Sequence, residues 1–180
     1  MDYFLLTDNL TKATGKLDNL TNGDNYCRQR AITSWNIELQ NLKKAYGMFY
    51  GCTTLTSFTR DLPVLTTASN MFRDCIALMS WDAPLPVLKD GSWMFDGCSA
   101  LTSFNIALPA LTHGDSMFNK CKLDLASVQN IADTINDLAA QGKTGVITIG
   151  MQSALRGNAD LAAALATIRN KGWTVTEQYN

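Results

Sequence analysis

The chain has 180 residues, of which 46% are hydrophobic and 17% are charged, which is enough apolar material for one domain with a buried core. Its formal net charge is −1, and the scattered basic residues do not form the basic surface typical of nucleic-acid-binding proteins. No stretch approaches the roughly 18 consecutive apolar residues of a membrane-spanning helix. We therefore expect neither nucleic-acid binding nor membrane insertion.

Residues 1–26 could form a coiled-coil stalk, a cap or a disordered segment. Apolar residues recur here at spacings of three and four, as at the a and d positions of a coiled coil. They are Tyr3, Leu6, Leu10, Ala13, Leu17 and Leu20. Such a stalk would hold a homotrimer, but the pattern is short, and Gly15 weakens a helix by about 1 kcal/mol relative to alanine. We therefore favour a cap on the exposed edge of the first repeat.

A 23-residue repeat organises residues 27–123. The pair Met-Phe, a cysteine, a leucine and the pair Ser-aromatic each recur at this interval, and we call residues at the same position of successive units a column. The Met-Phe pairs begin at Met48, Met71, Met94 and Met117, and the cysteine column is Cys52, Cys75, Cys98 and Cys121. Because a unit of this length cannot bury its apolar face alone, the four units must stack as coils of a solenoid.

Each unit contains a short strand, which the alternation of inward and outward residues predicts. The inward positions are Trp35, Ile37 and Leu39, then Phe58, Arg60 and Leu62, then Trp81, Ala83 and Leu85, then Phe104, Ile106 and Leu108. Arg60 is the exception in this apolar set. We expect either that its stem lies on the edge of the core with the guanidinium in solvent, or that this strand is locally bent.

The motif Met-Phe-x-x-Cys-x-x-Leu-x-Ser-aromatic, followed by Leu-Pro-x-Leu, resembles the BspA-like, or treponemal-type, leucine-rich repeat. The resemblance covers roughly residues 26–123, with Met at the place where that family usually has Ala. It implies an α/β fold, a right-handed leucine-rich-repeat solenoid with short parallel strands on its concave face. Members of the family are mostly bacterial surface adhesins, with relatives in protist and phage proteins, so the resemblance also implies a bacterial cell surface or a virion.

Residues 124–180 depart from the repeat and predict two units that each contain a helix and a strand. The expected elements are a helix at 128–138, a strand at 145–150, a helix from Asn158 or Asp160 to Ile168, and a strand at 173–176. Terminal repeats often differ from the rest, because the exposed end of a solenoid must be covered. We expect both units to extend the sheet and to cap the core of a single structural domain.

No residue set in the sequence predicts catalysis, a metal site or a cofactor. The column cysteines lack the Cys-x-x-Cys spacing of zinc sites and would point the same way, which suits buried free thiols better than disulfides. Cys27 lies two residues before the column position, which Gln29 occupies, and is the best candidate for a reactive thiol, although an inert thiol is the more common case. His113, the single histidine, has no assignable nucleophile and acid.

The outward positions of the predicted strands form a small, polar and mildly acidic stripe. It comprises Asn36, Glu38, Thr59, Asp61, Asp82, Pro84, Asn105 and Ala107, flanked by the serine column Ser34, Ser57, Ser80 and Ser103. The stripe is either an ordinary solvated sheet face or the surface that recognises a protein or glycan. Tyr46 and Tyr50 either add aromatic contacts or shield the edge of a coil.

Two functions remain, and neither is enzymatic. The first is an adhesin or receptor-binding module of a bacterial surface or a phage appendage, and a homotrimer held by residues 1–26 would favour the phage version. The second is a structural or assembly protein that docks to a neighbouring subunit. We favour the first. The N-terminal residues show no secretory signal, so the sequence itself assigns no compartment.

Overall fold

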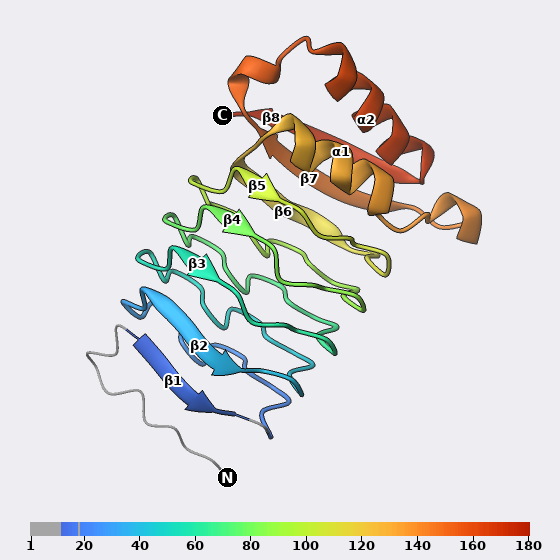
Figure 1. The fold of residues 1–180 in the computed structure, drawn as a ribbon. Helices are drawn as coiled ribbons and strands as arrows, with labels where there is room; N and C mark the ends of the chain where they lie inside the picture. The colour runs from blue at the N-terminus through green and yellow to red at the C-terminus, as the bar shows by residue number, and fades with distance from the viewer. Residues whose placement is uncertain (1–11, 18) are drawn as a thin grey trace.

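The computed structural model describes residues 12–17 and 19–180, with only the backbone for residues 12–16. The chain forms a stack of coils with two helix–strand units at its C-terminal end (Figure 1). The strands are β1 (Lys12–Lys16), β2 (Ser34–Glu38), β3 (Ser57–Phe58), β4 (Ser80–Trp81), β5 (Ser103–Phe104), β6 (Gly114–Leu123), β7 (Gly145–Met151) and β8 (Trp173–Tyr179), and the helices are α1 (Leu125–Thr134) and α2 (Ala159–Asn170), with short 3-10 turns at Ala139–Gln141 and Ser153–Leu155. Over these residues, no helix has the length and apolar character needed to cross a membrane.

Strands β1 to β5 lie along one side of the stack (Figure 1). Strands β1, β2 and β3 pair in parallel, as do β4 and β5, and the register places Trp35 beside Phe58 and Trp81 beside Phe104. The predicted inward residues are buried, apart from Arg60. Strand β2 has the predicted length, whereas β3, β4 and β5 are shorter than the alternation predicted. In the unit of β4 the ladder cannot continue through Pro84, which has no N–H to donate.

Two aromatic columns fill the core. Phe49, Phe72, Phe95 and Phe118 stack with their ring centroids 5.1, 5.9 and 5.7 Å apart. The aromatic residues of the strands meet this stack edge-on, as Phe58 meets Phe72 at 5.1 Å. Because such a ring pair contributes about 0.5–1.5 kcal/mol beyond its buried area, ring packing supplements the short strand ladders in holding successive coils together.

The four column cysteines are buried free thiols, as predicted. Each thiol donates to a backbone carbonyl of the preceding coil, and the Sγ of Cys75 lies 3.1 Å from the carbonyl oxygen of Phe49. Cys98 and Cys121 repeat this contact with the carbonyls of Phe72 and Phe95. Burial raises the pKa of the Cys52 thiol to about 11, so the column stays protonated near neutral pH.

Cys27 is also buried, which contradicts the reactive alternative for this thiol and agrees with the inert one. Its N–H donates to the carbonyl of Met48 just as the N–H of Phe49 donates to that of Met71, which places Cys27 in the phenylalanine column. The first coil is one residue shorter in this region, since Asn22 pairs with Lys44 at a step of 22. Burial accordingly raises the pKa of Cys27.

Residues 12–26 continue the stack of coils. Strand β1 pairs in parallel with β2, placing Ala13 opposite Trp35, and Leu17 is 4% exposed. Ala13 therefore lies in a strand, which rules out the alternative of a coiled-coil helix through this position; Tyr3, Leu6 and Leu10 lie outside the described residues. The solenoid includes residues that the sequence assigned to an N-terminal cap, because the parallel ladder extends to them.

The C-terminal units contain the predicted helices and strands, but these elements lie on other sides of the solenoid than the sequence predicted. Strand β7 pairs with β6, the segment that carries Met117 and Phe118, and β8 pairs with β7. Helix α1 instead covers the side of β5 (Figure 1). The expectation that these units extend the sheet of β1 to β5 is therefore wrong, since β7 and β8 extend the sheet on the opposite side.

Side chains of α1 complete the backbone hydrogen bonds at the edge of β5. The N–H of Phe104 donates to the Oγ of Ser127 at 2.9 Å, and the Nδ2 of Asn130 donates to the carbonyl of Ile106 at 2.8 Å. Asp124 caps the helix by accepting from the N–H of Ser127 at 2.8 Å. An edge strand otherwise presents unpaired groups that favour aggregation, so α1 closes this end of the sheet without a further strand.

Candidate binding surface

The outward side chains of β2 to β5, and of the residues that follow them in each coil, lie along one side of the stack, which we call the strand face. It comprises Ser34, Asn36, Glu38, Ser57, Thr59, Asp61, Ser80, Asp82, Pro84, Ser103, Asn105 and Ala107. These are the residues that the sequence placed on its outward stripe and serine column. All of them are exposed or half-buried, so the structure brings the predicted surface together, while its role in binding stays a prediction.

Arg60 divides the strand face into two halves. Its Nη1 lies 2.6 Å from Oε1 of Glu38, and its Nη2 donates to Oδ1 of Asn36. The other carboxylate oxygen of Glu38 accepts from Gln40 at 3.2 Å. The guanidinium therefore lies over the preceding strand. This agrees with the first of the two expectations in that the group leaves the core, but it is paired with Glu38 and Asn36 and does not lie free in solvent. In this half, the charged groups of Arg60 and Glu38 are therefore paired with each other within the chain.

The other half of the strand face contains an apolar hollow of about 390 Å³ between the coils of β4 and β5. Its lining residues are Asp82, Pro84, Leu85, Pro86, Asn105, Ile106, Ala107 and Pro109. The carboxylates of Asp82 and of its neighbour Asp61 form no hydrogen bond or ion pair with any residue that the structure describes. This half thus combines apolar walls with exposed carboxylates that have no partner among the described residues.

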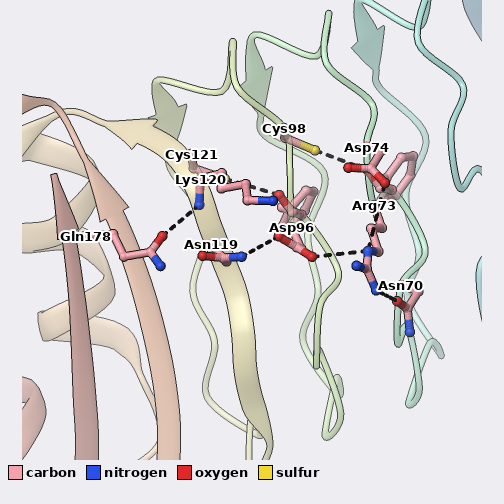
Figure 2. Close-up of polar contacts among 11 residues, drawn as sticks. Asn70, Arg73, Asp74, Asp96, Cys98, Asn119, Lys120, Cys121 and Gln178 are labelled. Atoms are coloured by element: carbon pink, nitrogen blue, oxygen red, sulfur yellow. Dashed lines mark hydrogen bonds and ion pairs between the residues drawn. The ribbon is translucent and has the colours of Figure 1, made fainter. Parts of the chain in front are cut away.

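The opposite side of the stack carries a ladder of polar side chains that bond to one another (Figure 2). The Nε of Arg73 lies 3.1 Å from Oδ2 of Asp96, whose Oδ1 accepts from Nδ2 of Asn119 at 2.6 Å. Asp96 is 4% exposed, so its charge is held by these neighbours and not by water. Gln178 of β8 continues the ladder by accepting from the N–H of Lys120 at 3.0 Å. These groups hold coils in register.

The sequence reasoning missed this ladder, although the repeat contains its signal. Tyr50, Arg73, Asp96 and Asn119 form one column at the 23-residue step, so complementary groups meet in adjacent coils. Tyr50 lies between Arg73 and Arg28, with its ring centroid 5.9 and 4.5 Å from their guanidinium carbons. Two roles were predicted for Tyr46 and Tyr50, contact with a ligand or shielding of a coil edge. Tyr50 therefore packs along the coil edge, whereas Tyr46 is 48% exposed.

The surroundings of His113 do not resemble a catalytic triad. Its Nδ1 lies 3.0 Å from the hydroxyl of Thr112, which also donates to the carbonyl of Lys89. The neighbouring Asp90 accepts from the Ser69 hydroxyl at 2.7 Å, and although burial opposes ionisation, hydrogen bonds from Ser92 and Ser69 lower its pKa. Across residues 12–17 and 19–180, no group of three or more His, Cys, Asp and Glu side chains could hold a metal ion.

Comparison with known proteins identifies the repeat. A family model described as the BspA type leucine rich repeat region matches residues 21–146 in six copies. The match extends beyond residues 27–123 on both sides. Comparisons with curated proteins and with solved structures give no match. Repeats of this family generally act as non-enzymatic, adhesin-like or protein-binding modules. The chain belongs to the BspA-type leucine-rich-repeat family.

Proposed function

We propose that this chain is a non-enzymatic module that binds a protein partner with its strand face, as an adhesin or receptor-binding part of a bacterial surface or phage appendage. One observation carries the proposal: Asp61, Asp82 and the hollow between the coils of β4 and β5 have no partner among the described residues. On the opposite side, Arg73, Asp96 and Asn119 satisfy each other. A free surface on a rigid stack is suited to recognition.

A protein partner is favoured over a glycan by the side chains of the strand face. The aromatic residues of the strands, such as Trp35 and Trp81, point into the core and are buried. The strand face therefore presents no aromatic ring that could stack on a sugar. Prolines and carboxylates remain, which suit apolar and basic side chains. The proposal also takes the solenoid to be right-handed with this face concave, as the family resemblance implies.

A library screen with matched charge variants tests the proposed function. The chain is screened against displayed protein domains, displayed peptides and a glycan array. A protein or peptide binder should emerge, and Asp61→Lys and Asp82→Lys should each weaken it at least about threefold, as expected for the loss of an exposed ion pair and the gain of repulsion. Asp133→Lys makes the same charge change on an exposed residue of α1 and should leave binding unchanged. Binders to glycans alone, or equal effects of all three variants, would contradict the proposal.

A scaffold protein that docks by its ends is the second candidate. In the sheet of β6, β7 and β8, strand β8 lies at the edge, and edge strands can add a strand from a partner. The homotrimer held by residues 1–26 is likewise a proposal. Light scattering of the full chain and of a chain lacking residues 1–11, which keeps strand β1 and the rest of the first coil, tests it, since a trimer should become a monomer on truncation. Monomers in both cases would overturn it.

A further inference from the structure

The hollow in the strand face has walls that are apolar and stiff. Leu85 and Ile106 form its floor and are 1% and 8% exposed. Pro84, Pro86 and Pro109 line it, and prolines offer no N–H and little conformational freedom. Binding there therefore leaves few donors unsatisfied and orders few side chains of the module. A volume of about 390 Å³ lies at the small end of ligand sites, which suits one or two side chains.

The hollow arises from a change of residue type along two columns. One column runs Glu38, Asp61, Pro84 and Ala107, and the next runs Ile37, Arg60, Ala83 and Ile106. In the coils of β2 and β3 these columns supply Glu38 and Arg60, which bond to each other, and Asp61, which has no partner among the described residues. In the coils of β4 and β5 they supply only apolar residues, of which Pro84, Ile106 and Ala107 line the hollow.

The rim of the hollow is acidic and has no counter-charge. Asp82 lines the hollow, and no lysine or arginine does. Asp61 lies in the preceding coil and is also exposed. The nearest cation in the two columns, Arg60, points to Glu38 and Asn36 instead. The ligand itself must therefore supply the positive charge, whereas phosphate groups would be repelled.

We propose, on the basis of the proposed function, that this half of the strand face binds an extended peptide segment of the partner. In this segment a large apolar residue stands next to a lysine or arginine. The apolar side chain enters the hollow against Leu85, Ile106 and the prolines. The basic side chain reaches Asp82, which lines the hollow, or Asp61, which is exposed in the preceding coil. Val87 adjoins Pro86 and is 37% exposed, so the apolar surface continues beyond the hollow for residues that flank the anchor.

Selection of displayed random 12-residue peptides tests this assignment. Peptides enriched on the wild-type chain should contain an apolar residue next to Lys or Arg. Ala107→Trp, which fills the hollow, should weaken the enriched peptides at least about tenfold, and Asp82→Asn about threefold, the size of an exposed ion pair. Ala126→Trp, at an exposed alanine of α1, and Asp133→Asn are the controls. The melting temperature of each variant confirms that it folds.

The outcomes separate this assignment from the proposed function. Enrichment of the apolar–basic pattern, lost in Ala107→Trp and kept in Ala126→Trp, supports both. A protein binder that is weakened by Asp61→Lys but not by Ala107→Trp overturns the peptide assignment and leaves the proposed function standing. Peptides enriched without a basic residue, or no enriched peptide at all, also overturn the assignment. A binder insensitive to every strand-face substitution overturns both.

Discussion

The two long sides of this solenoid use the same repeat for different purposes. On one side, Arg73, Asp96 and Asn119 occupy one column and bond to each other across adjacent coils (Figure 2), and the Tyr50 ring of the same column lies against Arg73. On the strand face, the members of the column Glu38, Asp61, Pro84 and Ala107 do not bond to each other, and Glu38 instead bonds to Arg60 of the adjacent coil. The repeat thus determines where a column lies, whereas the residues in it determine whether it joins coils or remains free for a partner.

If this comparison is correct, substitutions in the polar ladder should lower stability, whereas substitutions on the free half of the strand face should lower binding alone. The largest loss of stability should come from the core. Phe95 is fully buried and stacks on both Phe72 and Phe118. Phe95→Ala should lower the free energy of unfolding by about 3–5 kcal/mol, because it removes buried surface and leaves a cavity. Asp82→Ala should change it by less than about 0.5 kcal/mol. Urea unfolding measures both, and similar small effects would show that the assignment of sides is wrong.

The polar ladder should matter more than the ion pair of the strand face. Arg73→Ala should cost about 1–3 kcal/mol, because the buried carboxylate of Asp96 keeps only Asn119 as a partner. Arg60→Ala should cost less than about 1 kcal/mol, since both Arg60 and Glu38 are partly exposed. The comparison of the two unfolding free energies checks this. An Arg60 effect equal to or larger than that of Arg73 would contradict a structural role for the ladder.

The buried thiols should make the protein less stable at alkaline pH. The pKa of Cys52 is raised from about 9 to about 11 by burial, so its contribution is complete below pH 9 and is lost as the pH rises through 11. At pH 10 the loss from Cys52 should be about 1 kcal/mol. Tyrosines and lysines also titrate here, so Cys52→Ala serves as the matched control. Between pH 8 and 10, the free energy of unfolding of Cys52→Ala should fall less than that of the wild type, by that amount. An identical fall would contradict a raised pKa of the buried Cys52 thiol.

The smallest effect on stability should come from the free half of the strand face. Asp61→Lys and Asp82→Lys together should change the melting temperature very little, within about 0.5 kcal/mol of stability, because neither carboxylate has a partner in the described chain. Glu38 does not belong in this test, since it bonds to Arg60. Calorimetry measures the melting temperature, and a marked loss would mean that these carboxylates stabilise the fold.

The sequence predicts the columns but not the ends of the solenoid. A fixed step places Trp81 and Phe104 inward because every coil has the same geometry, and the structure confirms them as buried. The C-terminal units do not follow the 23-residue repeat, so the side of the solenoid on which each helix and strand lies could not be inferred from the sequence. The decisive contacts are the hydrogen bonds of Ser127 and Asn130 to the backbone around β5, and such long-range pairs leave no periodic pattern.

The candidate site shows a similar limit. Alternation placed Asp82 and Ala107 on the outward stripe, and both are exposed. It could not show that Arg60 bonds to Glu38 and Asn36, or that the coils of β4 and β5 leave a hollow, because these depend on side-chain conformation and on the space between coils. Cys27 was misplaced for a related reason, since a coil one residue shorter shifts the column without changing the motif.

Hydrogen exchange of the chain, with and without a partner selected in the library screen, tests the central claim most directly. The account predicts that the partner slows exchange in segments 80–89 and 103–112, which surround the hollow, and leaves the ladder segment 93–98 unchanged. Proline residues carry no amide, so the neighbouring N–H groups of Asp82, Leu85, Asn105 and Ala107 are the reporters. Protection confined to β8 or to the ladder segment would contradict recognition by the strand face.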